Sequence, residues 1–295
     1  MAQNIAVYGL GSMGYGIAQS VLRAGHRTWG VDINVDAVTR FRGEGGEAEP
    51  LEAGVLDTVI VVVLNAAQTE SVLFGENGVV SGMKSGACVI ACATVPPDFA
   101  RDMASRCAER GVHYLDAPIS GGSVKAAQGA LSVMAGGSAA AFTAAGPALD
   151  AMAETVFELG EVGAGSAMKS VNQLLAGVHI ATMAEALTFG MTQGVSPEKF
   201  VEVISQCAGT SWMLENRAPH IVDGDYTPHS AVNIWLKDLG IVLDIAEGAK
   251  FSAPLTAAAL QQFVAAAGQG LGGEDDAAVA KVYARNAGLT LPGED

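Results

Sequence analysis

The stretch "VYGLGSMG", Val7 to Gly14, places three glycines within eight residues near the start of the chain. An apolar run typical of a buried strand precedes it, and a helix-like segment rich in Ala and Leu follows to about Ala24. The order strand, GxGxxG, helix is that of a dinucleotide-binding turn. There, glycines let the backbone approach a pyrophosphate, which rests on the amino end of the helix. A tight turn with no ligand is the structural alternative.

Asp32 ends the second β-rich run, "TWGVD", at the spacing after Gly14 that is expected of a ribose-binding carboxylate. A carboxylate there accepts hydrogen bonds from both ribose hydroxyls and repels a 2′-phosphate. The sequence therefore predicts NAD rather than NADP as the cofactor.

The character of the sequence changes once along the chain. Up to about residue 160, short apolar runs with little alternation are separated by helical stretches, a pattern typical of a parallel sheet buried on both faces. Beyond Gly165, Ala-, Leu- and Met-rich helical segments dominate. We expect an α/β fold with an N-terminal Rossmann domain, a doubly wound parallel sheet, over residues 1–162, and an all-helical domain for substrate binding and oligomerisation over residues 163–295.

Composition limits the function classes. The chain has 295 residues, 50% of them hydrophobic, and a net charge of −15, and no cluster of Lys and Arg provides a nucleic-acid surface. Apolar runs such as "VIVVVL" are short, so no membrane span is expected, and the amino end lacks the pattern of a secretory signal. We expect a cytoplasmic protein. The four cysteines show no CxxC spacing, which predicts reduced, mostly buried thiols and no metal site.

A second motif, "LDAPISGG", follows the strand-like run "VHYL". Ser120, Gly121 and Gly122 would expose a hydroxyl and consecutive backbone N–H groups at a strand end, a combination that can hold a carboxylate. Lys125 would add a positive charge nearby. A Gly-rich turn followed by a solvated lysine is the alternative.

A third stretch, residues 163–187, reads as a helix from about Gly165 that is long enough to cross between domains. Lys169, Asn172 and Gln173 share one face of it, and the nearby residues are small and uncharged. This favours a site over a solvated lysine. His179 lies at the flank of that face, where packing or indirect support is favoured over substrate contact.

Lys237 and Asp238 interrupt an apolar helical stripe in "VNIWLKDLGIV". Such a pair marks either an ion pair at an interface or a site, and the pattern alone leaves both open.

Together, these four stretches resemble the β-hydroxyacid dehydrogenase family, whose members include 3-hydroxyisobutyrate dehydrogenases and tartronate semialdehyde reductases. The family signatures correspond here to GLGSMG, DAPISGG, the Lys169–Gln173 segment and the Lys237–Leu239 segment, in the same order. The resemblance covers nearly the whole chain, and four ordered matches are highly specific. Within the family, "SGGSVKAAQG" and "NQLLAGVHIA" look most like the branch that acts on four-carbon sugar acids.

The resemblance implies that Lys169 is the catalytic acid/base and that Ser120, Gly121 and Gly122 hold the substrate carboxylate. Asn172 would lie beside them in the pocket, and Lys237 would contact the cleft. Gln173 and Lys125 complete the expected substrate-binding set. The positions expected to bind the cofactor are Gly9, Leu10, Gly11, Ser12, Met13, Gly14, Asp32, Leu64, Thr94 and Lys237.

Two positions depart from the family pattern. Ala93 precedes Thr94 where members often carry Ser-Thr, so only Thr94 keeps a hydroxyl for the nicotinamide side. Lys125 replaces a glycine that is frequent in other branches, which suits a polyhydroxylated acid.

The sequence thus predicts an NAD-dependent dehydrogenase of a small hydroxy acid, acting as a homodimer or homotetramer. A related reductase of the same family is the first alternative. A catalytically silent NAD-binding sensor is a more distant one, because the retained Lys169 favours an enzyme.

Overall fold

The computed structural model describes residues 2–294, which divide into two compact units, one up to Lys169 and one from Ser170. The division falls within helix α7 (Ala164–Thr192). The first turns of α7 therefore belong to the first unit.

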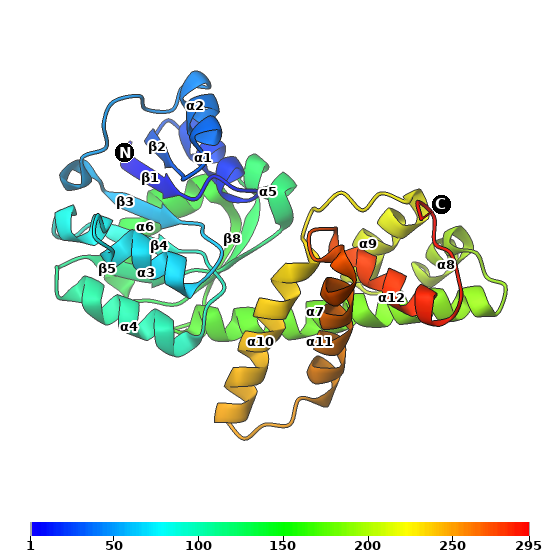
Figure 1. Ribbon diagram of the computed structural model, residues 1–295. Helices are drawn as coiled ribbons and strands as arrows, with labels where there is room; N and C mark the ends of the chain where they lie inside the picture. The colour runs from blue at the N-terminus through cyan, green and yellow to red at the C-terminus, as the bar shows by residue number, and fades with distance from the viewer. Residues whose placement is uncertain (1, 295) are drawn as a thin grey trace. The chain divides into compact units, whose positions relative to one another are not determined.

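The first unit contains a five-stranded parallel sheet in the order β2-β1-β3-β4-β5 (Figure 1). Its strands are β1 (Asn4–Tyr8), β2 (Arg27–Val31), β3 (Thr58–Val61), β4 (Cys88–Ala91) and β5 (His113–Asp116). The register places Ala6 of β1 beside Trp29 of β2 and Val59 of β3. The intervening helices are α1 (Gly14–Arg23), α2 (Val35–Gly43), α3 (Ala66–Phe74) and α4 (Pro97–Ala108), with 3₁₀ turns at Ala53–Val55 and Val79–Gly82.

A three-stranded sheet in the order β6-β7-β8 extends this unit. It consists of β6 (Ile119–Ser120), β7 (Leu131–Ala135) and β8 (Ala153–Glu158), with helices α5 (Gly122–Gln128) and α6 (Ala139–Met152) between the strands. β6 is antiparallel to β7, and β7 is parallel to β8. Main-chain hydrogen bonds between Asp116 and Gly136 connect β5 to the end of β7.

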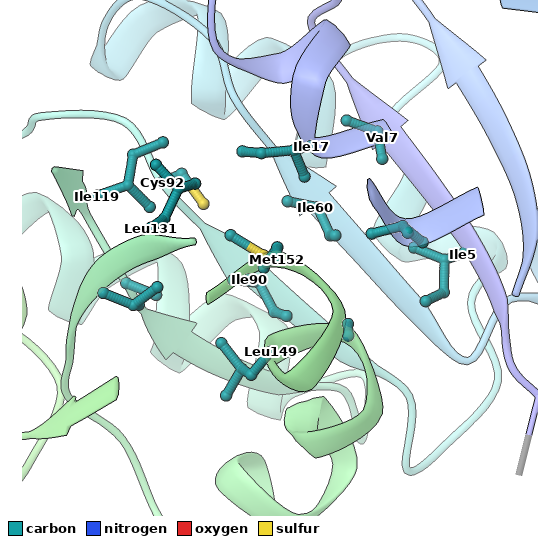
Figure 2. Close-up of a cluster of buried hydrophobic side chains, with 14 of the residues drawn as sticks. Ile5, Val7, Ile17, Ile60, Ile90, Cys92, Ile119, Leu131, Leu149 and Met152 are labelled. Carbon is teal, nitrogen blue, oxygen red and sulfur yellow. The ribbon is translucent and has the colours of Figure 1, made fainter. Parts of the chain in front are cut away.

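Alternate residues of the parallel strands pack into two cores. Ile5, Ile60 and Ile90 face one core together with residues of α1 and α6, including Ile17, Leu149 and Met152 (Figure 2). Ala6, Val59 and Val89 face the opposite core, against α3 and α4. Because both faces of the strands are buried, the predicted doubly wound sheet is confirmed.

The second unit is helical. It contains most of α7 together with α8 (Pro197–Ile204), α9 (Trp212–Asp223), α10 (Val232–Gly248), α11 (Pro254–Ala266) and α12 (Val279–Asn286), and short helical turns at Ala267–Leu271 and Asp276–Ala278. Its core contains Leu187 of α7, Leu239 of α10 and a stacked pair, Trp235 and Phe263, whose ring centroids are 5.6 Å apart.

Helix α7 meets the length and composition of a membrane-crossing helix, with a mean hydropathy of 1.4 in a window that is 39% buried. This criterion alone does not decide the expectation that the chain has no membrane span, because core helices also meet it. The same helix contributes Ile180, Met183 and Leu187 to the core of the second unit, as a core helix of a globular unit does.

Candidate functional site

The glycine-rich turn is shaped by two close backbone approaches. Gly9 has a φ of +95°, and a Cβ atom there would lie 2.4 Å from the carbonyl oxygen of Val62. A Cβ atom on Gly14 would lie 1.8 Å from the carbonyl oxygen of Gly9. By contrast, Gly11 has open space on its Cβ side. The turn therefore packs tightly on the sheet at Gly9 and Gly14 and leaves room at Gly11.

Helix α1 begins at this turn with no side-chain cap from Met13 and no acidic residue in its first turn. Main-chain N–H groups at a helix start favour an anion. A cavity of about 600 Å³ lies beside them and is lined by residues that include Leu10, Gly11, Ser12 and Arg40. The open space at Gly11 and these N–H groups fit the pyrophosphate of a dinucleotide.

Asp32 lies just beyond β2. One carboxylate oxygen accepts a hydrogen bond from the main-chain N–H of Leu10, and the other accepts one from the main-chain N–H of Asn34 at 2.7 Å. Each carboxylate oxygen can accept a further bond. Asp32 thus both orders the glycine turn and retains acceptor capacity for a ribose diol.

The remaining positions expected to line the cofactor in this unit follow two neighbouring strands. Leu64 comes after β3, and its side chain is 54% exposed; its main-chain N–H donates to Gln68 at 2.9 Å. Thr94 follows β4 and is half-buried. Both lie at the carboxyl edge of the sheet, where ligands of such folds bind.

The predicted carboxylate cradle lies where β6 ends. Gly121 has a φ of +135° and Gly122 a φ of +75°, so both adopt a backbone that favours glycine, and Ser120 is half-buried beside them. The Lys125 stem packs within 3.0 Å of the ideal Cβ position of Gly121. Its ammonium group lies 3.5 Å from Glu154 of β8, and both side chains are about half exposed or more.

Lys169 is buried, and its ammonium group donates a hydrogen bond to the carbonyl oxygen of Ile119 at 2.9 Å. Ile119 directly precedes Ser120 in β6. The structure therefore brings the predicted acid/base and the predicted carboxylate cradle together.

A buried carboxylate fixes the beginning of α7. Asp116 accepts hydrogen bonds from the N–H of Gly163 (3.0 Å), the N–H of Ser166 (2.8 Å) and the hydroxyl of Ser166 (2.6 Å). Burial raises the pKa of Asp116, and these hydrogen bonds oppose the increase. Gly165 allows close packing here, because a Cβ atom would lie 2.4 Å from the carbonyl oxygen of Asp116. Asp116 thereby fixes the start of the helix that carries Lys169.

The second unit holds the other predicted site residues. The Asn172 side-chain amide donates to Gln173 Oε1 at 2.9 Å, and Gln173 Nε2 donates to Asp238 Oδ2 at 2.5 Å. The ammonium group of Lys237 pairs with Asp238 Oδ1 at 2.6 Å. The open question about the Lys237–Asp238 pair is thus partly answered: the two residues form an ion pair, and Asp238 also connects to predicted site residues.

His179 is half-buried on α7. Three of the four free cysteines are buried, and Cys207 is exposed. No metal-binding group of His, Cys, Asp and Glu side chains occurs within residues 2–294.

Two family models together match most of the chain. The NAD-binding domain of 6-phosphogluconate dehydrogenase matches residues 4–160, and the NAD-binding domain of NADP-dependent 3-hydroxyisobutyrate dehydrogenase matches residues 163–283. The chain belongs to the β-hydroxyacid dehydrogenase family. It is an oxidoreductase whose first unit is an NAD-binding domain.

Relatives in this dehydrogenase family match over their full length. L-Threonate dehydrogenase of Cupriavidus necator is 51% identical and covers 100% of this chain and 99% of its own, and the protein of that name from Escherichia coli K12 is 45% identical, covering 98% and 97%. A crystal structure described as 3-hydroxyisobutyrate dehydrogenase from Salmonella typhimurium is 46% identical, with a TM-score of 0.89, and covers 95% of this chain and 99% of that one.

Three groups that hydrogen-bond to predicted site residues or to the start of α7 lie outside the predicted set. They are the carboxylate of Asp116, the main-chain carbonyl of Ile119 and the carboxylate of Asp238. Asp116 begins the DAPISGG motif and Asp238 stands in the Lys–Asp pair, so both carried a sequence signal. The main-chain carbonyl of Ile119 carried no sequence signal, because every residue has such a group.

Proposed function

We propose that this protein oxidises L-threonate at C2 to the 2-oxo acid 2-dehydro-L-erythronate, with NAD as the hydride acceptor. The observation that carries the proposal is the buried Lys169 held against Ile119 at the edge of the Ser120–Gly122 turn. The full-length likeness to L-threonate dehydrogenases at 45–51% identity supports the choice of acid.

The substrate carboxylate would rest on the Ser120 hydroxyl and the main-chain N–H groups of Gly121 and Gly122. Asn172 lies one turn after Lys169 on α7, which places the two on the same side of that helix. Lys125 would approach the carboxylate or a distal hydroxyl. Lys237 would serve the cofactor side, together with Thr94 and Leu64.

Lys169 would act as the general base. The nicotinamide, when bound, accepts the hydride that leaves the C2 carbon. As the neutral amine, Lys169 would take the C2 hydroxyl proton while the C=O double bond forms, and it would return that proton in the reverse reduction.

The cofactor would be bound by Gly9, Leu10, Gly11, Ser12, Met13 and Gly14, with the pyrophosphate at the amino end of α1. Asp32 would accept hydrogen bonds from the adenosine ribose diol. A 2′-phosphate there would meet the Asp32 charge, which supports NAD over NADP.

One experiment tests the proposal directly. Three- to five-carbon hydroxy acids, including L-threonate, D-threonate, 3-hydroxyisobutyrate and glycerate, are incubated with NAD or NADP, and NADH or NADPH formation is followed by absorbance. L-Threonate with NAD should give the highest kcat/KM. A higher kcat/KM for 3-hydroxyisobutyrate would instead support the second candidate, which the description of the Salmonella structure favours.

We also propose a homodimer or homotetramer. On α7, Val171, Leu175 and Phe189 are 54%, 50% and 66% exposed, and their spacing places them along one side of the helix. Exposed apolar side chains in a row are typical of a surface that another subunit covers.

A further inference from the structure

A hydrogen-bonded chain of side chains runs from α10 to α7 within the second unit. Asp238 pairs with Lys237 through Oδ1 at 2.6 Å and accepts from Gln173 Nε2 through Oδ2 at 2.5 Å. Gln173 Oε1 then accepts from Asn172 Nδ2 at 2.9 Å. Two amides in series thus lead from a carboxylate to a residue of the proposed site.

The orientation of the Gln173 and Asn172 side-chain amides follows from the charge of the Asp238 carboxylate. An ionised carboxylate only accepts hydrogen bonds, so Gln173 must turn its NH₂ group toward Asp238. The Gln173 oxygen then faces Asn172, which must donate a hydrogen bond to it from its own NH₂ group. We propose that Asp238 is a positioning residue that, through Gln173, makes Asn172 present its oxygen Oδ1 on the side away from Gln173.

Burial and close packing hold this row of hydrogen-bonded side chains in place. Gln173 is 7% exposed, so a reversed amide would turn its NH₂ group away from Asp238 Oδ2 and leave buried polar atoms unpaired. At Gly177, one turn beyond Gln173, a Cβ atom would lie 2.8 Å from Leu239 and 3.0 Å from Trp235. This close packing of α7 on α10 keeps Gln173 within reach of Asp238.

The consequence concerns the substrate class and rests on the proposed function. An amide oxygen accepts a hydrogen bond from a hydroxyl and repels the oxygens of a carboxylate. Asn172 is therefore set to bind a substrate O–H group, whereas the carboxylate is left to the Ser120–Gly122 turn. A hydroxy acid with several hydroxyls offers such a donor.

The substitution Asp238→Asn should reverse this direction. The new side-chain amide at position 238 would turn its oxygen toward the Lys237 ammonium, and its NH₂ group would face Gln173. Gln173 would then rotate by half a turn, and Asn172 would rotate in response, presenting NH₂ where the native protein presents Oδ1. The size and shape of the substituted side chain are nearly unchanged, so the variant tests direction rather than packing.

A double-mutant cycle between Asp238→Asn and Gln173→Met measures whether the effect travels through Gln173. The assay uses whichever hydroxy acid the native enzyme turns over fastest. Asp238→Asn alone should lower kcat/KM by about tenfold to a hundredfold. In the Gln173→Met background, the same substitution should change kcat/KM by less than about threefold. Equal losses in both backgrounds would show that Asp238 acts through Lys237 instead, and would overturn the proposal.

Asp244→Asn on the same helix is the matched control, because Asp244 is exposed; it should leave kcat/KM unchanged. Melting temperatures report folding of every variant. If Asp238→Asn does not fold, Gln173→Met alone must reproduce the tenfold loss, since it removes the relay and leaves the ion pair; native activity in that variant would overturn the proposal.

A second readout needs no turnover, which separates this inference from the proposed function. In ¹⁵N-labelled protein, the side-chain NH₂ resonances of Asn172 are assigned by their loss in Asn172→Ala. They should shift on Asp238→Asn in the native background and stay in place in the Gln173→Met background. If no acid is oxidised but this pattern appears, the proposed function fails and the relay stands; an unmoved Asn172 resonance overturns the relay.

Discussion

The ammonium group of Lys169 and the carbonyl oxygen of Ile119 lie 2.9 Å apart, in a hydrogen bond between the first turns of α7 and strand β6. The partner is a main-chain atom one residue before Ser120. The position of the amine is therefore tied to the backbone that leads into the Ser120–Gly122 turn.

Replacing Lys169 by Ala should lower kcat by about 10² to 10⁴ because the hydroxyl proton loses its acceptor. NADH binding, followed by its fluorescence, should remain nearly native. Lys199→Ala is the control, since Lys199 is an exposed lysine paired with Glu202. Near-native turnover in Lys169→Ala would remove this residue from the mechanism.

NAD should be preferred over NADP by at least about tenfold in kcat/KM, which corresponds to roughly 1.4 kcal/mol. Asp32→Ser should reduce that preference, because the repulsion of a 2′-phosphate is lost. Steady-state kinetics with both cofactors measure this ratio of kcat/KM values. Glu76→Gln removes one exposed charge elsewhere on the unit and should leave the ratio unchanged. Equal use of NAD and NADP by the native enzyme would contradict the role given to Asp32.

Lys125→Ala should lower kcat/KM for L-threonate by roughly tenfold to a hundredfold, the cost of a lost charge-assisted hydrogen bond of about 1.5–3 kcal/mol. A much smaller loss with 3-hydroxyisobutyrate would assign the contact to the extra hydroxyls, and a similar loss would assign it to the carboxylate. Glu154→Gln, which frees Lys125 from its surface partner, should not lower activity. If neither acid responds to Lys125→Ala, the lysine serves only the ion pair.

Only one thiol per chain should react quickly with a thiol reagent at about pH 8 in the native protein. Burial raises the pKa of Cys88, Cys92 and Cys107 to about 12 each, so these thiols stay protonated at that pH, whereas Cys207 is exposed. After unfolding in guanidinium, all four should react. Cys207→Ser should abolish the fast phase, and a second fast thiol in the native state would contradict the burial of the other three.

Leu175→Glu combined with Phe189→Glu should shift the molar mass measured by light scattering toward that of a single chain, because charges on the exposed side of α7 oppose its coverage by another subunit. Asp223→Asn, remote from that side in sequence, is the control. A native protein that already runs as a monomer would refute the oligomer proposal.

Much of the fold could be predicted from local pattern. The apolar runs of β1 to β5, β7 and β8 and the glycine turn before α1 are each specified by neighbouring residues. Strand β6 has only two residues, Ile119 and Ser120, and exists because β7 offers it antiparallel partners. The start of α7 is likewise bound by the distant carboxylate of Asp116, which no local window contains.

The candidate site shows the same limit. Lys169, Asn172 and Gln173 share a helix face, which a 3.6-residue period predicts. The direction in which the Gln173 amide turns depends on Asp238, which lies far along the chain on α10. Sequence spacing on one helix does not contain that information.

Strand β5 ends at Asp116, whose main chain pairs with Gly136 and whose carboxylate binds the start of α7. The segment of residues 117–135 therefore begins and ends at the paired residues Asp116 and Gly136. It accepts the hydrogen bond of Lys169 through the main-chain oxygen of Ile119, which any amino acid at that position supplies. In the proposed function, this segment supplies the carboxylate cradle and Lys125, whereas α7 supplies Lys169 and Asn172. We expect that the corresponding segment of a relative can be exchanged between these two junctions with the Lys169–carbonyl hydrogen bond retained, because that bond uses a main-chain oxygen.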